Sequence, residues 1–404
     1  MNRRTAQPHS SFRKFAILVV VPIAALYLFS ACSDKPTAPV RADFSAATKD
    51  PTIVELWHGP GSRAYAVNPA GLVVGTIGTK LTPPFQVVLW DHGTLIEVAN
   101  LCRTASCEDL LTPIGINAAG QIVGTSVMEA FLWNRGELTN VGSLAGNISR
   151  ASWINERGDV LGAVILCRGD LPPYIRNLQT TCAERAVLWR QGNPIDLGAL
   201  GGLFSSAAGL NSAGTVAGTA ELTHVRFANS EVHAFVWQDG AMTDLGTLGG
   251  LHSSATGINA AGQVVGFSET ADGAIDAVVW DRGSMTDLGE GRACAINAPG
   301  QIVGFRNGSA VMWDHGNMIP LGVAMSDCTI DGGVPSMVIN AAGQVAMNSC
   351  TATCSAYKWE RGILTRLDDA GGGEATISDI NPRGWIVGQS TDQAGEPRAV
   401  LWTH

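Results

Sequence analysis

Charged residues are scarce in this chain of 404 residues, since Asp, Glu, Lys and Arg together make up only 15% of it. Basic residues are the scarcer kind: 26 stand against 35 acidic ones, for a formal net charge of −9 at pH 7. Nucleic acids and anionic lipid surfaces are bound mainly through Lys and Arg. The composition therefore argues against either as the main partner, and we predict no nucleic-acid binding.

Sequence motifs of catalysis and cofactor binding are also absent. The chain has no Gly-x-Ser-x-Gly turn, no His-Glu-x-x-His pair, no phosphate-binding loop with its Lys and no Asp-x-Asp-x-Asp-Gly calcium loop. We therefore predict no cofactor, no catalytic residue and no metal ligand. The sequence leaves open whether the protein is an enzyme and favours a protein that is not one.

The apolar run at residues 15–29 is too short for a membrane-spanning helix and contains Pro22. Basic residues precede it and small residues follow, which is the order of a secretory signal. Residues 28–32, Leu-Phe-Ser-Ala-Cys, resemble a bacterial lipobox. That resemblance implies a signal peptide at residues 1–31, a lipid on Cys32 and a polar tether at residues 32–50. By the bacterial sorting rule, the absence of Asp at position 33 favours anchoring at the outer membrane. A plain secretory signal with an incidental cysteine is the alternative.

A unit of roughly 40 residues recurs eight times between residue 51 and the C-terminus, a period typical of propellers and solenoids. One copy is Ser-Ser-Ala-Thr-Gly-Ile-Asn-Ala-Ala-Gly-Gln-Val-Val-Gly at residues 253–266, then Ala-Val-Val-Trp at 277–280 and Met-Thr-Asp-Leu-Gly at 285–289. Each copy has an Asn-x-x-Gly turn, whose Asn is residue 68, 117, 155, 211, 259, 297, 340 or 381. Each also has a Trp that ends an apolar run, at residue 90, 133, 189, 237, 280, 313, 359 or 402.

Each unit is predicted to form four short antiparallel strands, the content of one propeller blade. Asn first and Gly fourth suit a type I turn, so the Asn-x-x-Gly segment predicts a hairpin between the first two strands. A Trp-x-x-Gly segment predicts a second turn, between the third and fourth strands. One Trp per unit at a fixed place is expected to fill the gap between neighbouring sheets.

The two ends of the repeat region complement each other. The last unit stops at Trp402-Thr403-His404 and lacks a fourth strand, whereas residues 52–57 match a fourth strand with nothing before them. We therefore predict an all-β fold at residues 51–404, an eight-bladed β-propeller in which the N-terminal strand completes the last blade and hides the free edges. Seven blades are the alternative.

His233-Ala-Phe-Val-Trp237, followed by Asp-Leu-Gly-Thr-Leu-Gly-Gly at residues 244–250, resembles the bacterial extracellular HAF repeat. Other copies keep only Ala-Phe-Leu-Trp at residues 130–133 or Ala-Val-Leu-Trp at 186–189. The resemblance covers residues 51–404 and implies an exported β-rich repeat protein. It brings no established activity and no catalytic residues.

Insertions fall only in the connections between second and third strands and between successive units, at residues 76–86, 101–113, 163–185, 220–232 and 321–335. In an antiparallel blade both connections open on one face, called here the insertion face; the opposite, hairpin face carries the short turns. Insertions confined to one face mark it as a binding surface. Eight cysteines besides Cys32 belong to this face and are candidate disulfides: Cys102 and Cys107, Cys167 and Cys182, Cys350 and Cys354, with Cys294 and Cys328 remaining. Zinc on Cys328, Cys350 and Cys354 is the alternative.

The best polar cluster predicted for the insertion face comprises Glu221, His224, Arg226, Glu231, His233 and His252, with an ordinary solvated loop as the alternative. We predict a monomeric binding module that recognises a glycan, a protein or a cell-surface ligand, and that meets the membrane only through its lipid. A hydrolase or lyase with a site over the central channel, or a structural scaffold of the envelope, are the alternative functions.

Overall fold

The computed structural model describes residues 52–57, 61–79, 82–98, 112–126, 129–144, 148–167, 182–222, 230–325, 327–330, 334–350 and 353–403. These residues form 34 strands and no helix. Among them, no helical segment is long and apolar enough to cross a membrane. The predicted signal peptide, Cys32 and the tether lie outside the described residues, as do Cys102, Cys107, His224 and Arg226.

Antiparallel groups of four strands follow one another along the described chain, as the repeat predicts, and we number them as sheets in chain order. The fourth and fifth are joined by one parallel pairing into a continuous eight-stranded sheet. Sheets 1 and 2 contain β2 (Arg63–Val67), β3 (Val73–Thr79), β4 (Thr82–Asp91) and β5 (Thr94–Glu97), then β6 (Thr112–Ile116), β7 (Ile122–Thr125), β8 (Ala130–Asn134) and β9 (Glu137–Asn140). Sheets 3 and 4 contain β10 (Ser149–Ile154), β11 (Val160–Cys167), β12 (Cys182–Arg190) and β13 (Asn193–Asp196), then β14 (Ser205–Leu210), β15 (Val216–Glu221), β16 (Val232–Gln238) and β17 (Ala241–Asp244). Sheets 5 and 6 contain β18 (Gly249–Ile258), β19 (Val264–Thr270), β20 (Ile275–Asp281) and β21 (Ser284–Glu290), then β22 (Arg292–Ile296), β23 (Ile302–Arg306), β24 (Ser309–Asp314) and β25 (Asn317–Ala324). Sheet 7 contains β28 (Met337–Ile339), β29 (Val345–Cys350), β30 (Cys354–Glu360) and β31 (Ile363–Arg366), and sheet 8 contains β32 (Gly371–Ile380), β33 (Ile386–Asp392), β34 (Pro397–Thr403) and β1 (Thr52–Glu55).

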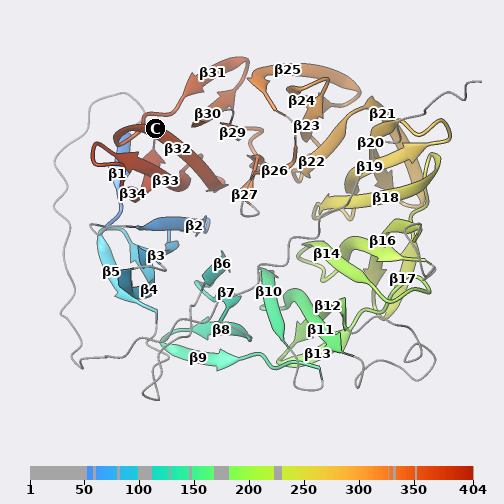
Figure 1. Cartoon of the computed structure of the whole chain (residues 1–404), viewed down its shortest axis with the longest axis horizontal. Helices are drawn as coiled ribbons and strands as arrows, with labels where there is room; N and C mark the ends of the chain where they lie inside the picture. The colour runs from blue at the N-terminus through green and yellow to red at the C-terminus, as the bar shows by residue number, and fades with distance from the viewer. Residues whose placement is uncertain are drawn as a thin grey trace, which may run out of the picture.

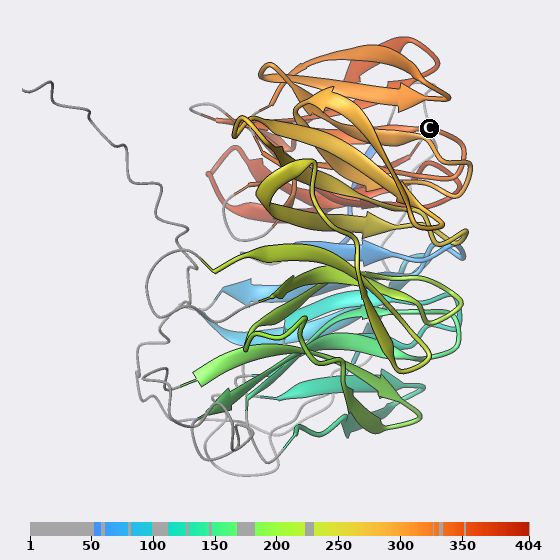
Figure 2. The same ribbon diagram turned by 90° about the vertical axis from the view of Figure 1, so that its right-hand side faces the viewer.

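The sheets stand around a common centre, with the first strand of each innermost (Figure 1). The first and last described strands lie side by side, because β1 pairs antiparallel with β34 from Thr52 opposite Thr403 to Glu55 opposite Val400. Figure 2 shows the sheets edge-on, stacked one after another. The predicted all-β fold of four-stranded antiparallel sheets is therefore confirmed.

The repeated Asn holds its own turn and also bonds to the next sheet. In the turn of Asn259, the carboxamide oxygen accepts the N–H groups of Ala261 and Gln263 at 3.1 and 3.0 Å. Its Nδ2 donates to the carbonyl of Asn297, the equivalent residue of the following sheet, at 3.1 Å. All eight asparagines are buried and each donates to the next, in the order Asn68, Asn117, Asn155, Asn211, Asn259, Asn297, Asn340, Asn381 and back to Asn68.

Apolar residues fill the gaps between neighbouring sheets in eight separate clusters. Each cluster joins two consecutive sheets and contains one repeated Trp, as predicted; Trp280, for example, packs with residues of sheets 4 and 5. The cluster of Trp90 joins sheet 1 to Val387, Ala399 and Leu401 of sheet 8. The core is thus distributed between the sheets, and each sheet depends on both of its neighbours.

A glycine in the second strand lets the innermost strand bulge over it. In sheet 5 the pairing of β18 with β19 shifts by one residue between Ala255 and Gly257. A Cβ on Gly266 would collide there with the carbonyl oxygen of Ser254. The equivalent glycines of the other bulged sheets meet the same obstacle: Gly75, Gly124, Gly162, Gly218, Gly304 and Gly388. Sheet 7 has Met347 at this place, and there the pairing of β28 with β29 is regular.

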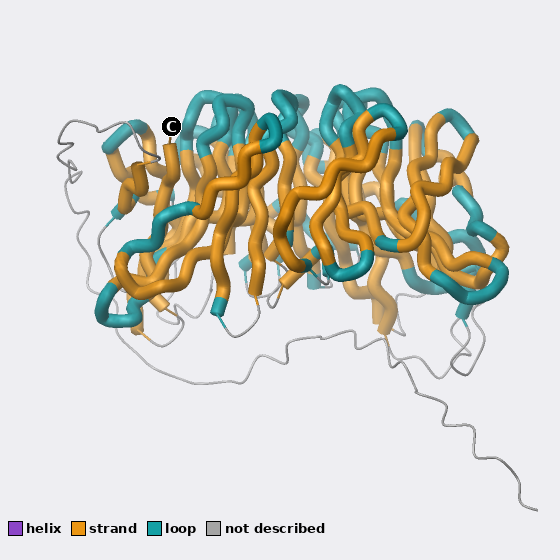
Figure 3. The backbone as a smooth tube through the Cα atoms, turned by 90° about the horizontal axis from the view of Figure 1, so that it is seen from above, coloured by secondary structure: helices purple, strands orange, loops and turns teal. Residues whose placement is uncertain are grey.

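The hairpin face is uniform, and its described turns gather at the upper edge of Figure 3. The turns after the third strands have positive φ at both central residues, as in Arg282 and Gly283 with φ of 49° and 81°. This type I′ geometry matches the twist of a β-hairpin, and Gly adopts it without strain. It recurs in sheets 1 to 7, with His92, Arg135, Gln191, Asp239, Arg282, His315 and Arg361 preceding the glycine.

Candidate functional site

The described members of the predicted polar cluster meet at the junction of sheets 4 and 5. Glu221 ends β15 opposite Val232 of β16, and Val232 pairs in parallel with His252 of β18. The carboxylate of Glu221 is buried and accepts the N–H of Leu203 at 2.7 Å, so it supports the local backbone. The backbone carbonyl of Glu231 accepts the N–H of Leu222.

The two histidines of this cluster differ in their surroundings. His233 Nδ1 lies 2.9 Å from Oδ1 of Asp244 on the neighbouring strand β17. His252 Nδ1 is buried and has no hydrogen-bond partner among the described residues. Glu221 and His233 are thus both engaged in local contacts at this junction.

The contact of His233 with Asp244 belongs to a repeated pair between third and fourth strands. In sheet 3 the same place holds Arg185 and Asp196, with Nε and Oδ1 3.3 Å apart. In sheet 5 it holds two carboxylates: burial and the neighbouring Asp287 raise the pKa of Asp276. Asp196, Asp244 and Asp287 also each accept the N–H of the glycine two residues later. The same two positions thus face each other in several sheets but hold different residues, so the contact between His233 and Asp244 is one case of a repeated structural pair.

Disulfides join strands that border the insertion face. Cys350 and Cys354 are bonded to each other across β29 and β30. Cys182 is disulfide-bonded as well, and it lies opposite Cys167 in the pairing of β11 with β12. Disulfides form and persist in oxidising compartments, so these bonds indicate an exported protein.

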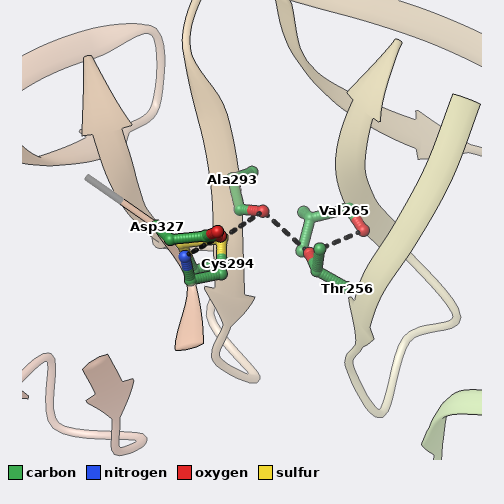
Figure 4. The surroundings of a disulfide bond; sticks show 6 residues. Thr256, Val265, Ala293, Cys294 and Asp327 are labelled. Carbon is green, nitrogen blue, oxygen red and sulfur yellow. Dashed lines mark hydrogen bonds between the residues drawn. A yellow bond between two sulfur atoms is a disulfide. The ribbon is translucent and has the colours of Figure 1, made fainter. Parts of the chain in front are cut away.

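The bond between Cys294 and Cys328 connects the innermost strand of sheet 6 to the connection that leads to sheet 7. That connection forms a small ribbon, β26 (Thr329–Ile330) with β27 (Val334–Pro335), which lies close to the centre of the ring (Figure 1). Beside the disulfide, Thr256 of sheet 5 donates to the carbonyl of Ala293 at 2.8 Å (Figure 4). The alternative of zinc on Cys328, Cys350 and Cys354 is wrong, because the three sulfur atoms are in disulfides.

A set of residues that the sequence did not single out occupies one register position on every innermost strand. In seven sheets, this residue pairs with the residue that follows the bulge glycine. In sheet 7, Ser336 accepts a backbone hydrogen bond from Asn348, the residue that follows Met347. We call this set the inner ring: Arg63, Thr112, Arg150, Ser206, Ser254, Arg292, Ser336 and Thr376. All eight are arginine, serine or threonine. Their spacing from the repeated Asn could have identified them in the sequence. Seven of them stand five residues before a repeated Asn, and Ser336 stands four residues before one.

The inner ring lies toward the insertion-face end of the innermost strands. Arg63, Thr112 and Arg292 are the first residues of their strands, whereas β18 and β32 begin before Ser254 and Thr376. Arg292 lies over the ring of Phe267 in the preceding sheet, 4.1 Å from its centroid. Similarly, the hydroxyl of Ser254 lies 2.8 Å from that of Thr219. Arg63 stacks over Tyr65, and its Nε is buried without a hydrogen-bond partner among the described residues.

Carboxylates near these strands are few among the described residues. Burial raises the pKa of Glu184, and Arg150 opposes that shift. Asp379 lies further along its innermost strand, where its Oδ2 accepts the N–H of Val67 at 2.9 Å. Burial raises the pKa of Asp379 to about 6. In the described part of the chain, no other acid or histidine is a hydrogen-bond or ion-pair partner of Asp379, so Asp379 does not form a catalytic pair there.

A cavity of about 340 Å³ lies on the opposite, hairpin face between sheets 4 and 5. It is lined by repeated turn and interface residues, including Asn211, Trp280 and Arg282. The same residue types line the interfaces between other neighbouring sheets. The cavity is therefore a wider version of the usual gap between two sheets, and its described lining has no side chains that would mark it as a specific binding site.

No protein-family profile matches the chain, and no curated protein matches its sequence. Among solved structures, it is similar in fold to a Mycobacterium tuberculosis puromycin-hydrolyzing peptidase at 13% identity and a TM-score of 0.47, covering 79% of this chain and 56% of that one. A Pyrococcus horikoshii acylaminoacyl peptidase gives 15% identity, a TM-score of 0.45, and coverage of 81% and 57%. A structure from a study of two prolyl endopeptidases gives 12% sequence identity and a TM-score of 0.49, covering 86% of this chain and 55% of that one. The chain spans little more than half the length of these enzymes, and likenesses of this strength carry no argument about activity or ligand.

Proposed function

We propose that this protein is an exported, lipid-anchored binding module of the HAF-repeat type, built on an eight-bladed propeller that the N-terminal strand closes. The closed series of asparagine bonds supports the closure, because Asn381 donates to Asn68 at 3.1 Å as each Asn donates to its successor. The pairing of β1 with β34 supports the role of the N-terminal strand. A closed disc of this kind is a rigid platform for loops.

The observation that carries the binding role is the difference between the two faces. The hairpin face repeats one asparagine turn and one type I′ turn from sheet to sheet. The insertion face has connections that range from the two-residue Asn307-Gly308 turn to long insertions, and it carries the ribbon of β26 and β27. A scaffold without a ligand has no need for such one-sided variation.

The proposed partner is a glycan, a protein or another cell-surface ligand, bound by a monomer that Cys32 tethers to the outer membrane. The test is binding of the full chain to a panel of envelope glycans and surface proteins. In a matched variant, Asn-Gly replaces residues 222–231, which copies the natural short turn of sheet 6 at the equivalent connection.

We expect this replacement to weaken binding while the melting temperature changes little, and Arg282→Gln on the hairpin face to leave binding unchanged. Unchanged binding after shortening the other long connections in turn would refute the insertion face as the binding surface. Turnover of a panel substrate would favour the hydrolase or lyase instead. For the anchor, Cys32→Ala should move the protein from the membrane fraction to the soluble fraction.

A further inference from the structure

The inner ring concentrates positive charge in an otherwise acidic protein. Three of its eight positions are arginine, Arg63, Arg150 and Arg292, and the other five carry hydroxyl groups. The arginines stand on sheets 1, 3 and 6, so consecutive arginines are two, three and three sheets apart around the ring (Figure 1). Their spacing around the ring is therefore close to threefold.

The register places the backbones of the three arginines at one level of their strands. Each arginine directly precedes the bulge of its strand, opposite Thr76, Ala163 and Phe305 respectively. The bulge glycine of the second strand packs against the carbonyl of the same residue, which fixes the backbone height of the three arginines in their sheets. All three arginines are partly exposed.

The guanidinium groups of Arg63 and Arg292 have aromatic rather than acidic neighbours in the described part of the chain. Arg63 lies over Tyr65 and Arg292 over Phe267, contacts that hold a cation in place without neutralising it. Arg150 interacts electrostatically with Glu184, which offsets part of one charge. Guanidinium groups held in this way are suited to carboxylate, sulfate or phosphate oxygens, which they bind with charge-assisted hydrogen bonds. Among the hydroxyl members, Ser336 is buried and Ser254 contacts Thr219, so the arginines are the principal donors.

We propose that the inner ring is an oxyanion-binding site, and that the ligand of the insertion face is an acidic saccharide whose carboxylate or sulfate groups enter the mouth of the central channel. This inference rests on the proposed binding function and names its ligand class. The acidic surface elsewhere repels anions, so the local positive field at the centre selects where an anion binds. Free inorganic sulfate or phosphate offers the same chemistry.

The test is calorimetric titration of the full chain, purified in detergent, with a uronic-acid oligosaccharide, its neutral counterpart, sodium sulfate and sodium phosphate. We expect the acidic oligosaccharide to bind more tightly than the neutral one. Each of Arg63→Gln, Arg150→Gln and Arg292→Gln should weaken that binding about tenfold, the usual worth of a charge-assisted contact. The control Arg366→Gln, on an exposed outer strand, should change it less than twofold. Raising the salt concentration should weaken binding to the wild type, a readout that needs no variant.

Equal affinity for the acidic and neutral oligosaccharides, or arginine variants that bind as the wild type does, would overturn the inference and leave the proposed binding function standing. No binding of any of the four anionic or neutral probes would overturn it as well. Sulfate or phosphate binding as tightly as the oligosaccharide, and lost in the same three variants, would support the site and assign it to the free ion. If a Gln variant unfolds, Lys at the same position should keep the charge and most of the binding.

Discussion

Replacing Asn259 by Ala should destabilise the protein by about 3 kcal/mol, because one buried side chain makes several bonds at once. Its Oδ1 accepts the N–H groups of Ala261 and Gln263, and its Nδ2 donates to the carbonyl of Asn297. The carbonyl of Asn297 keeps a second bond, from the N–H of Gly300. Two N–H groups are left unpaired and one bond between sheets is lost, at about 1 kcal/mol each.

Urea unfolding followed by tryptophan fluorescence measures this loss. The control is Asn317→Ala at an exposed position, which should change the free energy of unfolding by less than about 0.5 kcal/mol. Asn381→Ala should cost as much as Asn211→Ala, since each of these side chains makes two bonds within its turn and one to the next sheet. Asn259 has a further bond, to Oε1 of Gln263. A loss below about 1 kcal/mol at Asn259 would refute the reasoning, and a clearly smaller loss at Asn381 than at Asn211 would argue that sheets 8 and 1 are not joined.

Three further predictions concern the bulges, the disulfide and one buried acid. Gly266→Ala should cost about 3 kcal/mol in urea unfolding, because the new methyl group collides with the Ser254 carbonyl; an unchanged midpoint would contradict the bulge account. Replacing Cys294 and Cys328 together by Ala should cost about 4 kcal/mol, from the entropy of a loop closed over a sequence separation of 34. Urea unfolding of the wild type and the double variant under non-reducing conditions should show this difference, and equal free energies of unfolding would contradict it. Burial raises the pKa of Asp379 to about 6, above its unfolded value near 3.9, so its stabilising contribution is full below about pH 4 and is lost as the pH rises through 6. Asp379→Asn should therefore raise the melting temperature at pH 8 and leave it nearly unchanged at pH 4, and an equal effect at both pH values would contradict the shift.

The strands and the interface tryptophans could be predicted from the sequence because they repeat at a fixed period, and periodicity reports local structure. The role of the repeated Asn was predicted only in part. Its bonds within the turn follow from residue type, whereas its bond to the next sheet depends on a residue 38 to 56 positions away in most sheets. Such a partner becomes identifiable only when the sheets are placed side by side.

The candidate site shows the same division. Glu221, His233 and His252 were predicted to belong to a polar cluster on the insertion face. The strand pairing places them at the junction of sheets 4 and 5, and their role in binding stays a prediction. The arginines of the inner ring were not identified, because each is a single residue in its own repeat and the equivalent residue elsewhere is Ser or Thr. Their common level depends on the bulges, which arise from long-range contact between a glycine and the neighbouring strand.

Hydrogen–deuterium exchange of the full chain, with and without the uronic-acid oligosaccharide, tests the central claim of binding at the insertion face and inner ring most directly. We predict slower exchange in peptides that contain the starts of β2, β10 and β22, which carry Arg63, Arg150 and Arg292. Peptides of the hairpin face, such as residues 281–284, should exchange at the same rate in both samples. Protection confined to the hairpin face, or no protection at the three arginine strands, would contradict the account.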